Sequence, residues 1–524
     1  MLSENSTHNH MGDDRVANFF GVMHIGSEQV SLQIVEYNSL RDMKVVERAS
    51  TQVTLGEETF KTGKISFAAV RELCDLIKGY RRILSEYGVK DCRLLATTAI
   101  REAANQQYII DQIKVRTGLT VEVVDMPQEI FHKYIALFRC IAAEGLAEEK
   151  EGILFVDISS GGLAFTLYEA GVLQYQQNIH IGALRIKESF DKSQRESAHF
   201  YQALTEYIYS TIEPAEAELN QHKIKYLVLS GVETGLLLKM LGRDEGAKLT
   251  FVSIEDFLRL YDQVKQLNLP QVMQTFGLSE HRAEMVLPTI VLYQQILALS
   301  NVAQIVVSEA QFGDGITLSH IAEKTGDKWL EVIEGQIISF AHALGRKYKH
   351  DPRHAASVEE TSLLLFDRLT KVHGLGRRER FLLKVAAILH DIGKFVSLRS
   401  HYFYSYRLII SSDIIGFSEE ERALMANIAY YHSKGTPSAS DPNFVALTSA
   451  QRITLAKLAA IIRVADSVDR SHMQKAVIRD IALSGEELII TVAAEQDISL
   501  EEWTFLDKAD YFENVFGIRP ILQR

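Results

Sequence analysis

The N-terminal part of the chain alternates between strand patterns and helix patterns. Apolar and polar residues alternate over residues 18–37 around a His-Ile-Gly-Ser turn, which predicts two paired strands. A helix is predicted over 67–87, and a short buried strand follows over 93–96. Residues 152–171 repeat the order of strand, small-residue turn and strand, and similar patterns cover 226–233 and 304–315. The repetition predicts a duplicated α/β unit with a cleft between its halves.

The pattern changes beyond residue 322, where strand signals stop and helical periodicity runs over 329–465. The charged stretch GRKYKHDPR, at 345–353, marks where one helix ends and an all-helical domain opens. The predicted fold class is therefore α/β followed by all-α, with a small α/β domain at the end. The predicted boundaries are a disordered tail over 1–15, α/β domains over 16–134 and 135–321, a helical domain over 326–475 and a small α/β domain over 476–524.

Composition and charge are those of an ordinary globular protein. Hydrophobic residues make up 47% and charged residues 24% of the 524 residues. The net charge of −12 does not attract nucleic acid or an anionic membrane, so we expect neither as a partner. The three cysteines lie far apart in the sequence, which predicts free thiols and a cytoplasmic location. We expect no run of the roughly 20 apolar residues that a membrane span needs.

Histidines and aspartates of the helical domain follow the order of an HD-type metal site. His390 and Asp391 end an apolar helix, where an imidazole and a carboxylate can reach one ion. A single histidine among the 17 is more often a core or surface residue, but each member of this ordered series falls at a helix end or turn. The predicted ligands of one metal are His354, His390, Asp391 and Asp466, and those of a second are His401 and His432, with Asp391 bridging.

A metal pair of this kind predicts the hydrolysis of phosphate esters. Two ions a few ångströms apart would activate a water and hold phosphoryl oxygens, and Lys394 would neutralise the substrate. Imidazole and carboxylate ligands suit several divalent ions. Mg²⁺ or Mn²⁺ is the first expectation, and Fe²⁺ or Zn²⁺ are alternatives in this site.

Several motifs resemble those of the exopolyphosphatase/guanosine pentaphosphate phosphatase (Ppx/GppA) family. They are HIGSEQVSLQIVE, ATTAIREAAN, FVDISSGGLAFTLYE and HIGALRIKESF in the α/β part. AAILHDIGKF, IAYYHSKGTP and IIRVADSVDRSH are similar to the long members, which add an HD-like helical domain and a small tail. The resemblance implies two actin-like (ribonuclease H-like) halves around a phosphate-binding cleft. It also implies inorganic polyphosphate or a phosphorylated guanosine nucleotide as ligand, and a tendency to form homodimers.

The resemblance implies a role for particular residues of the α/β cleft. Glycine-rich turns let backbone N–H groups approach phosphate oxygens, and a carboxylate holds Mg²⁺ or activates water. Asp157 would face the metal, and Glu129 would be the catalytic base. The simplest alignment puts Gln128 at the position of that base, and a shift by one residue restores Glu129. The implied phosphate-binding residues are Gly26, Ser27, Arg101, Gly161 and Gly162.

The chain departs from the family pattern at several positions of this cleft. His24 replaces the aspartate of the first turn, and Ala164 replaces a glutamate beyond the second turn. Glu233 and Glu309 stand where the family uses glycines. Glutamine cannot take a proton from water and alanine cannot hold a metal. The departures indicate weakened chemistry in the α/β cleft, whereas the ligand set of the helical domain is complete.

Three hypotheses about function remain. In the first, the HD-type site hydrolyses a phosphate ester or nucleotide, and the α/β cleft binds a phosphorylated regulator or only carries the active domain. In the second, the α/β cleft releases terminal phosphate from polyphosphate or guanosine pentaphosphate. In the third, the chain is a non-catalytic sensor of polyphosphate or of a guanosine tetraphosphate-like ligand. The first predicts that hydrolysis depends on His390 and Asp391, and the second that it depends on Glu129.

Overall fold

The computed structural model describes residues 18–243 and 246–524, so the tail predicted over 1–15 lies outside the described residues. The chain forms two compact units, of which the first combines residues up to Val124 with Gln311–Leu330. The second unit holds Asp125–Ala310 and Glu331–Arg524. These units differ from the predicted boundaries at 134 and 321, because the helix after the last α/β strand returns to the first sheet.

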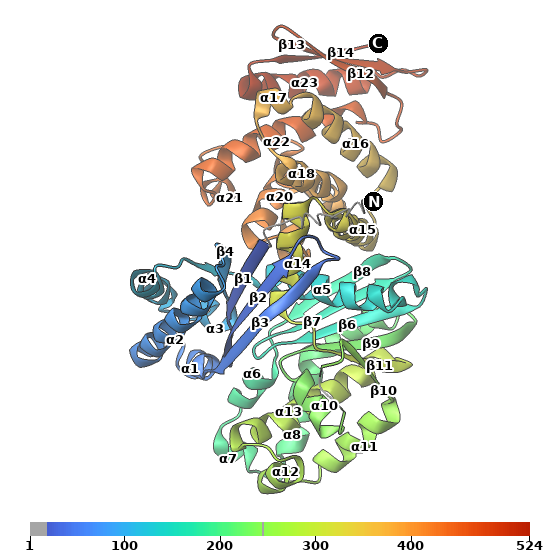
Figure 1. The fold of residues 1–524 in the computed structure, drawn as a ribbon. Coiled ribbons are helices and arrows are strands. Elements are labelled where there is room, and N and C mark those ends of the chain that lie inside the picture. Colours follow the sequence, from blue (N-terminus) through green and yellow to red (C-terminus); the bar gives the residue numbers. More distant parts are fainter. Residues whose placement is uncertain (1–17, 244–245) are drawn as a thin grey trace, which may run out of the picture. The chain divides into compact units, whose positions relative to one another are not determined.

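A five-stranded sheet with the order β3-β2-β1-β4-β5 forms the centre of the first unit (Figure 1). β1 pairs antiparallel with β2 and parallel with β4, so the predicted strand pair around the His-Ile-Gly-Ser turn is confirmed. The strands are β1 (Asn18–Ile25), β2 (Gln29–Tyr37), β3 (Met43–Gln52), β4 (Asp91–Ala96) and β5 (Val121–Val123). The helices are α1 (Leu55–Thr62), α2 (Phe67–Glu86), α3 (Thr98–Arg101), α4 (Gln106–Thr117) and α14 (Phe312–Thr325).

The second unit contains a six-stranded sheet with the order β10-β11-β9-β6-β7-β8. The order β8-β7-β6-β9-β11 within this sheet has the same strand directions as β3-β2-β1-β4-β5 in the first sheet. The predicted duplication is therefore confirmed. The strands are β6 (Gly152–Ile158), β7 (Leu163–Glu169), β8 (Val172–Ile179), β9 (Ile224–Gly231), β10 (Leu249–Val252) and β11 (Gln304–Ser308). The central strand β6 is buried along its whole length, between the antiparallel strand β7 and the parallel strand β9.

Helices pack around this second sheet. They are α5 (Met126–Ala143), η1 (Leu146–Glu148), α6 (Ala183–Glu188), α7 (Lys192–Arg195), α8 (Phe200–Ile212), η2 (Glu213–Ala215), α9 (Glu216–Leu219), α10 (Thr234–Met240), α11 (Ile254–Val264), α12 (Leu269–Phe276) and α13 (Glu280–Ser300). α13 is the one described helix that has the length and mean hydropathy, 1.3, to cross a membrane, which corrects our expectation about apolar runs. Because 72% of its apolar window is buried in the structure, α13 is the core helix of this domain.

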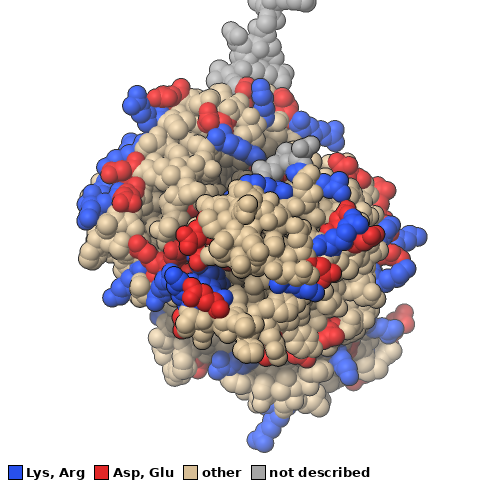
Figure 2. Space-filling model, turned by 90° about the horizontal axis from the view of Figure 1, so that it is seen from below, with Lys and Arg blue, Asp and Glu red and all other residues tan. Residues whose placement is uncertain are grey.

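The predicted all-helical domain begins with α15. Its elements are α15 (Trp329–Lys347), α16 (Pro352–Arg368), α17 (Thr370–His373), α18 (Arg377–Leu389), η3 (Ile392–Phe395), α19 (His401–Ser411), α20 (Glu419–Tyr431), α21 (Pro442–Val445) and α22 (Ser449–Val468). The small C-terminal domain consists of β12 (Val477–Ser484), β13 (Glu487–Ala493), α23 (Ser499–Phe516) and β14 (Arg519–Gln523), with the sheet order β12-β13-β14. On the face drawn in Figure 2, the basic side chains of the described residues lie interspersed with acidic ones.

Candidate metal centre and phosphate pocket

The six predicted metal ligands come from five helix ends of one domain, and the structure brings them together. His354 lies in the first turn of α16, which Asp351 caps through the backbone N–H of His354. His390 and Asp391 follow α18. The other three are His401 at the start of α19, His432 at the end of α20 and Asp466 in the last turn of α22.

All four imidazoles use Nδ1 for a hydrogen bond outside the centre. A backbone carbonyl only accepts, so a ring bonded to one donates its Nδ1–H and presents a lone pair on Nε2. The partners of Nδ1 are Asp469 for His354 (2.9 Å), Ala387 for His390 (2.7 Å), Leu398 for His401 (3.3 Å) and Ala429 for His432 (2.5 Å). The four rings are therefore oriented with Nε2 toward a common point, as imidazole ligands of a metal are.

The carboxylate of Asp391 lies between two pairs of imidazoles. Its Oδ2 is 3.8 Å from Nε2 of His354 and 3.6 Å from Nε2 of His390. Its Oδ1 is 3.4 Å from Nε2 of His401 and 3.6 Å from Nε2 of His432. This Oδ1 is buried and accepts no hydrogen bond from the described residues. Asp466 contacts the first pair, at 3.3 Å from His354. The arrangement fits two divalent ions with Asp391 between them.

Electrostatics keep most of these groups ready to bind a cation. Burial lowers the pKa of His390 to about 3, so this ring is neutral at neutral pH. Burial alone would raise the pKa of Asp391, but His390, His432 and Lys394 hold it well below its usual range. Burial also opposes charge on His354, yet hydrogen bonds with Asp466 and Asp469 raise its pKa to about 9. A proton on His354 therefore balances part of the negative charge of the two carboxylates.

Further residues complete the centre. Lys394, predicted to neutralise the substrate, forms an ion pair with Asp391. His472 stacks on His354 with ring centroids 3.6 Å apart, and its Nε2 lies 3.2 Å from Lys394 Nζ. The sequence pattern did not single out His472 or Asp469, although both lie within six residues of Asp466. Their spacing of three from Asp466 to Asp469, one helical turn, was the signal that could have identified the second carboxylate.

The loop that carries His432 is fixed by a buried arginine. Nη1 of Arg463 donates to the carbonyls of Tyr431, Ser433 and Gly435, at 2.8, 2.8 and 2.7 Å. Lys508 of α23 donates to the same carbonyl of Ser433. One guanidinium thus binds three carbonyls that precede and follow His432 in the sequence, which fixes the main chain around this histidine.

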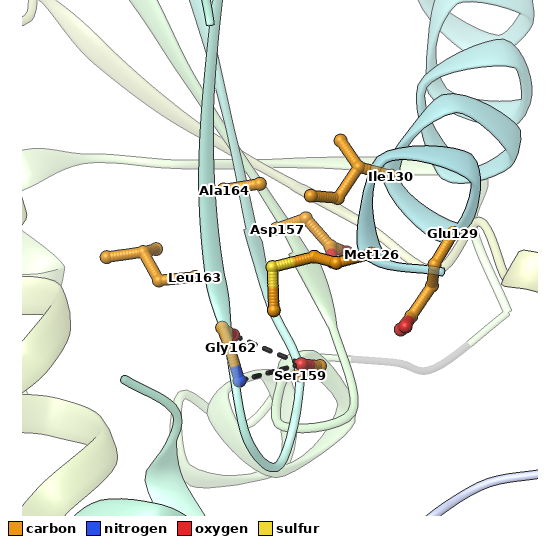
Figure 3. Close-up of a pocket in the computed structure, with 8 residues that line it drawn as sticks. All are labelled: Met126, Glu129, Ile130, Asp157, Ser159, Gly162, Leu163 and Ala164. Carbon is orange, nitrogen blue, oxygen red and sulfur yellow. Dashed lines mark hydrogen bonds between the residues drawn. The ribbon is translucent and has the colours of Figure 1, made fainter. Parts of the chain in front are cut away.

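A small pocket of the second α/β domain holds the implied catalytic carboxylates (Figure 3). Asp157 ends β6 and Glu129 lies in the first turn of α5. Both carboxylates contact the ammonium of Lys133, at 2.7 Å for Asp157 and 3.1 Å for Glu129. The hydroxyl of Ser230 donates to the other oxygen of Asp157 at 2.9 Å.

The second glycine turn closes on itself beside this pocket. The N–H of Gly162 donates to the Ser159 hydroxyl at 3.0 Å, and that hydroxyl lies 3.1 Å from the Gly162 carbonyl. Figure 3 shows the side chain of Met126 reaching toward this turn, and a Cβ on Gly162 would lie 3.2 Å from Met126 Cε. The carbonyl of Gly161 accepts from Arg185 at 2.8 Å. The backbone N–H of Gly162 is therefore hydrogen-bonded within the turn itself.

The remaining implied phosphate-binding residues belong to the first unit. The N–H of Gly26 donates to Gln29 at 2.9 Å, and the carbonyl of Ser27 accepts from Gly56 at 2.8 Å. Arg101 donates to the carbonyl of Val124 at 2.7 Å and to the Thr98 hydroxyl at 3.0 Å. His24, at the position of the family's aspartate, lies 3.0 Å from the Thr97 hydroxyl.

Two family models match nearly the whole chain. The model of the Ppx/GppA phosphatase family matches residues 33–324, and the model of Ppx/GppA phosphatase domain III matches residues 339–509. The chain belongs to the Ppx/GppA phosphatase family. The resemblance stated from the motifs is therefore confirmed, and the helical part corresponds to domain III of the family.

Curated relatives and solved structures agree with membership of the Ppx/GppA family. A guanosine-5'-triphosphate,3'-diphosphate pyrophosphatase of Photobacterium profundum is 20% identical over 91% of this chain and 92% of its own length. Exopolyphosphatase 1 of Mycobacterium leprae is 29% identical over 23% of this chain and 35% of its own length. The crystal structure of an exopolyphosphatase from Cytophaga hutchinsonii matches with a TM-score of 0.51 and 23% identity, covering 58% of this chain and 98% of that chain. The predicted actin-like fold is thereby confirmed.

Proposed function

We propose that this Ppx/GppA phosphatase hydrolyses a phosphate ester or nucleotide at the metal centre of its helical domain. The observation that carries the proposal is the position of Asp391, whose two oxygens each face one pair of imidazoles. Divalent ions bound there would lower the pKa of a water and polarise phosphoryl oxygens. His354, His390 and Asp466 would hold one ion with Asp391, and His401 and His432 the other.

The side of the centre that solvent reaches favours an organic phosphate. Lys394, His401 and His472 are the partly exposed members, with 32, 15 and 25% of their side chains accessible. A phosphate arriving there meets the ammonium of Lys394, which stabilises its negative charge. Phe395 follows Lys394 in the sequence, and its side chain is 53% exposed. An exposed aromatic residue adjacent in the sequence to this cationic group suits the organic part of an ester or nucleotide better than an inorganic chain.

The pocket of the second α/β domain takes a different role in this proposal. Its carboxylates are paired with Lys133, and Ala164 lies directly opposite Asp157 in the β6–β7 ladder. We therefore assign hydrolysis to the helical domain and ligand binding without hydrolysis to the α/β part. The names of the relatives suggest a phosphorylated guanosine nucleotide or polyphosphate as that ligand.

Two near-isosteric variants test the assignment. Asp391→Asn should lower metal-stimulated hydrolysis by roughly 100-fold or more. Loss of a residue that only orients a metal ligand already lowers activity about 10–100-fold, and Asp391 would be a ligand itself. Glu129→Gln should leave that activity unchanged. The assay is a panel of phosphomonoesters, phosphodiesters, nucleotides and tripolyphosphate, combined with metal analysis of the purified full-length protein. His342→Ala, a partly exposed histidine of α15 outside the centre, is the matched control.

The results separate the alternatives. Loss of hydrolysis in Glu129→Gln with retention in Asp391→Asn would move the activity to the α/β pocket, as in a conventional exopolyphosphatase. Hydrolysis unaffected by either variant, together with a purified protein that holds no divalent metal, would overturn the proposal.

A further inference from the structure

We infer that the ammonium of Lys133 takes the place of a divalent cation in the α/β pocket, so that the pocket of this chain excludes metal. The family resemblance implies Mg²⁺ between Asp157 and its neighbours. The residues present do not fit such an ion. This inference deepens the proposed function, because it supplies the physical reason why the α/β pocket binds without hydrolysis.

The position of the ammonium excludes an ion at the same two carboxylates. Nζ of Lys133 lies 2.7 Å from Oδ2 of Asp157 and 3.1 Å from Oε1 of Glu129. Mg²⁺ binds oxygen ligands at about 2.1 Å. An ion bound to both of these oxygens would overlap Nζ, so the lysine must leave before the ion can enter.

Burial makes the departure of Lys133 costly. The side chains of Lys133, Glu129 and Asp157 are only 11, 7 and 9% exposed. Burial alone would lower the pKa of Lys133, but the two carboxylates outweigh it and hold that pKa above its ordinary value. The lysine is therefore charged, and moving it would remove the positive charge that balances two buried carboxylates.

Beyond these two carboxylates the pocket offers few oxygen ligands, so an ion that replaced the ammonium would take most of its ligands from water. Mg²⁺ requires six ligands in octahedral geometry, supplied by oxygens of protein, water or substrate. Apolar side chains occupy much of the wall, namely Met126, Ile130, Leu163 and Ala164. Ala164, opposite Asp157, brings no carboxylate, and the Ser159 hydroxyl is engaged with Gly162.

Helical spacing explains how the sequence delivers this cation. Lys133 follows Glu129 by four residues on α5, so both side chains leave the same face of the helix. Asp125 caps α5 by accepting from the N–H of Gln128, which fixes the start of the helix beside the pocket. The pair of Glu129 and Lys133 thus forms within one helix, and only Asp157 comes from a different element, the strand β6.

Removal of the lysine charge should create a metal site. The test uses full-length protein with Asp391→Asn and Asp466→Asn, so that the helical centre contributes little binding, and follows Mn²⁺ by electron paramagnetic resonance. We expect no site that depends on Glu129 while Lys133 is present. Lys133→Met should add about one Mn²⁺ per chain, and a further Glu129→Gln should remove it. Lys187→Met is the matched control, because Lys187 is also buried and paired with Glu284 at 2.8 Å.

Two outcomes would overturn the inference. One is Mn²⁺ binding by protein that retains Lys133, if Glu129→Gln abolishes that binding. This measurement needs no substitution at Lys133. The other is a folded Lys133→Met or Lys133→Gln protein that gains no Mn²⁺. Failure of the proposed function is distinguishable, because it would appear as unchanged hydrolysis and metal content when Asp391→Asn is introduced alone.

Discussion

His354 and Asp469 form a buried pair in which Nδ1 of the imidazole lies 2.9 Å from a carboxylate oxygen. Both side chains are 1% exposed. Gln474 donates to Asp469 from its backbone N–H at 2.7 Å and from its side-chain amide at 2.9 Å. Gln474 therefore fixes the carboxylate, and the carboxylate orients the imidazole, which directs Nε2 of His354 toward Asp466.

This pair predicts that Asp469 controls metal affinity without being a ligand. Asp469→Asn keeps the shape of the side chain. It removes the negative charge that makes Nε2 of His354 a stronger electron-pair donor to a metal ion. We expect the affinity of the apo protein for Mn²⁺ to fall about 10–100-fold, as for other carboxylate partners of metal-bound histidines. Calorimetric titration measures the change. The control is Asp480→Asn on β12, an exposed carboxylate, and unaltered affinity in a folded Asp469→Asn protein would contradict the expected role.

The position of His401 depends on a glycine. A Cβ at Gly393 would lie 2.0 Å from the carbonyl oxygen of His401 and 2.3 Å from the backbone nitrogen of Ser405. The N–H of Gly393 also donates to the Ser405 hydroxyl at 2.9 Å. η3 and the first turn of α19 can approach this closely only without a side chain between them. The same contact keeps His401 within reach of Asp391.

Gly393→Ala should therefore separate His401 from Asp391. We expect destabilisation by about 1–3 kcal/mol, as for other overpacked positions, and loss of one of two bound metal ions. Thermal unfolding and metal analysis of the same sample provide the two readouts. Gly335→Ala is the control, since no atom lies within 4 Å of its added Cβ on α15. Full retention of both ions in Gly393→Ala would show that the close approach is unnecessary for the second ion.

The fold was predictable where local pattern and tertiary structure agree. Alternation around the His-Ile-Gly-Ser turn predicted β1 and β2, and the buried run before the second turn predicted β6. Alternation gave no comparable signal for β3 or β14, which are edge strands with polar or partly exposed residues. The return of α14 to the first sheet could not be predicted either, because helical periodicity identifies an apolar face but not the sheet that it covers.

The two candidate sites also differed in how far the sequence alone could predict them. Residue type and order predicted the six histidines and aspartates of the helical centre, since each ligand is recognisable by its chemistry. Lys133 gave no signal, because a lysine on a helix is usually a solvated residue, and only tertiary structure brings it to Asp157. Arg463 is another example, since its three carbonyl partners depend on the path of the loop after α20.

Asp413 is a partly buried carboxylate between α19 and α20. Its Oδ2 accepts from the backbone N–H of Asn178 at 2.8 Å. Burial raises the pKa of Asp413 above its ordinary value, although the hydrogen bond from Asn178 and the charge of Arg422 act in the opposite direction. Since the pKa in the folded state exceeds that in the unfolded state, the contribution of Asp413 to stability is fully present below the unfolded pKa of about 4. It is lost as the pH rises through the folded pKa.

The sign of this linkage predicts the behaviour of Asp413→Asn. Asparagine keeps an oxygen that accepts from Asn178 but carries no charge to desolvate. The variant should match the parent near pH 4 and become progressively more stable than it as the pH rises toward 7. The difference between the two thermal midpoints across this range is the measurement. Asp497→Asn is a control of opposite sign, because a hydrogen bond from Ser499 lowers the pKa of Asp497 and its neutralisation should give no gain at pH 7. A midpoint difference for Asp413→Asn that stays constant with pH would mean that Asp413 titrates alike in both states.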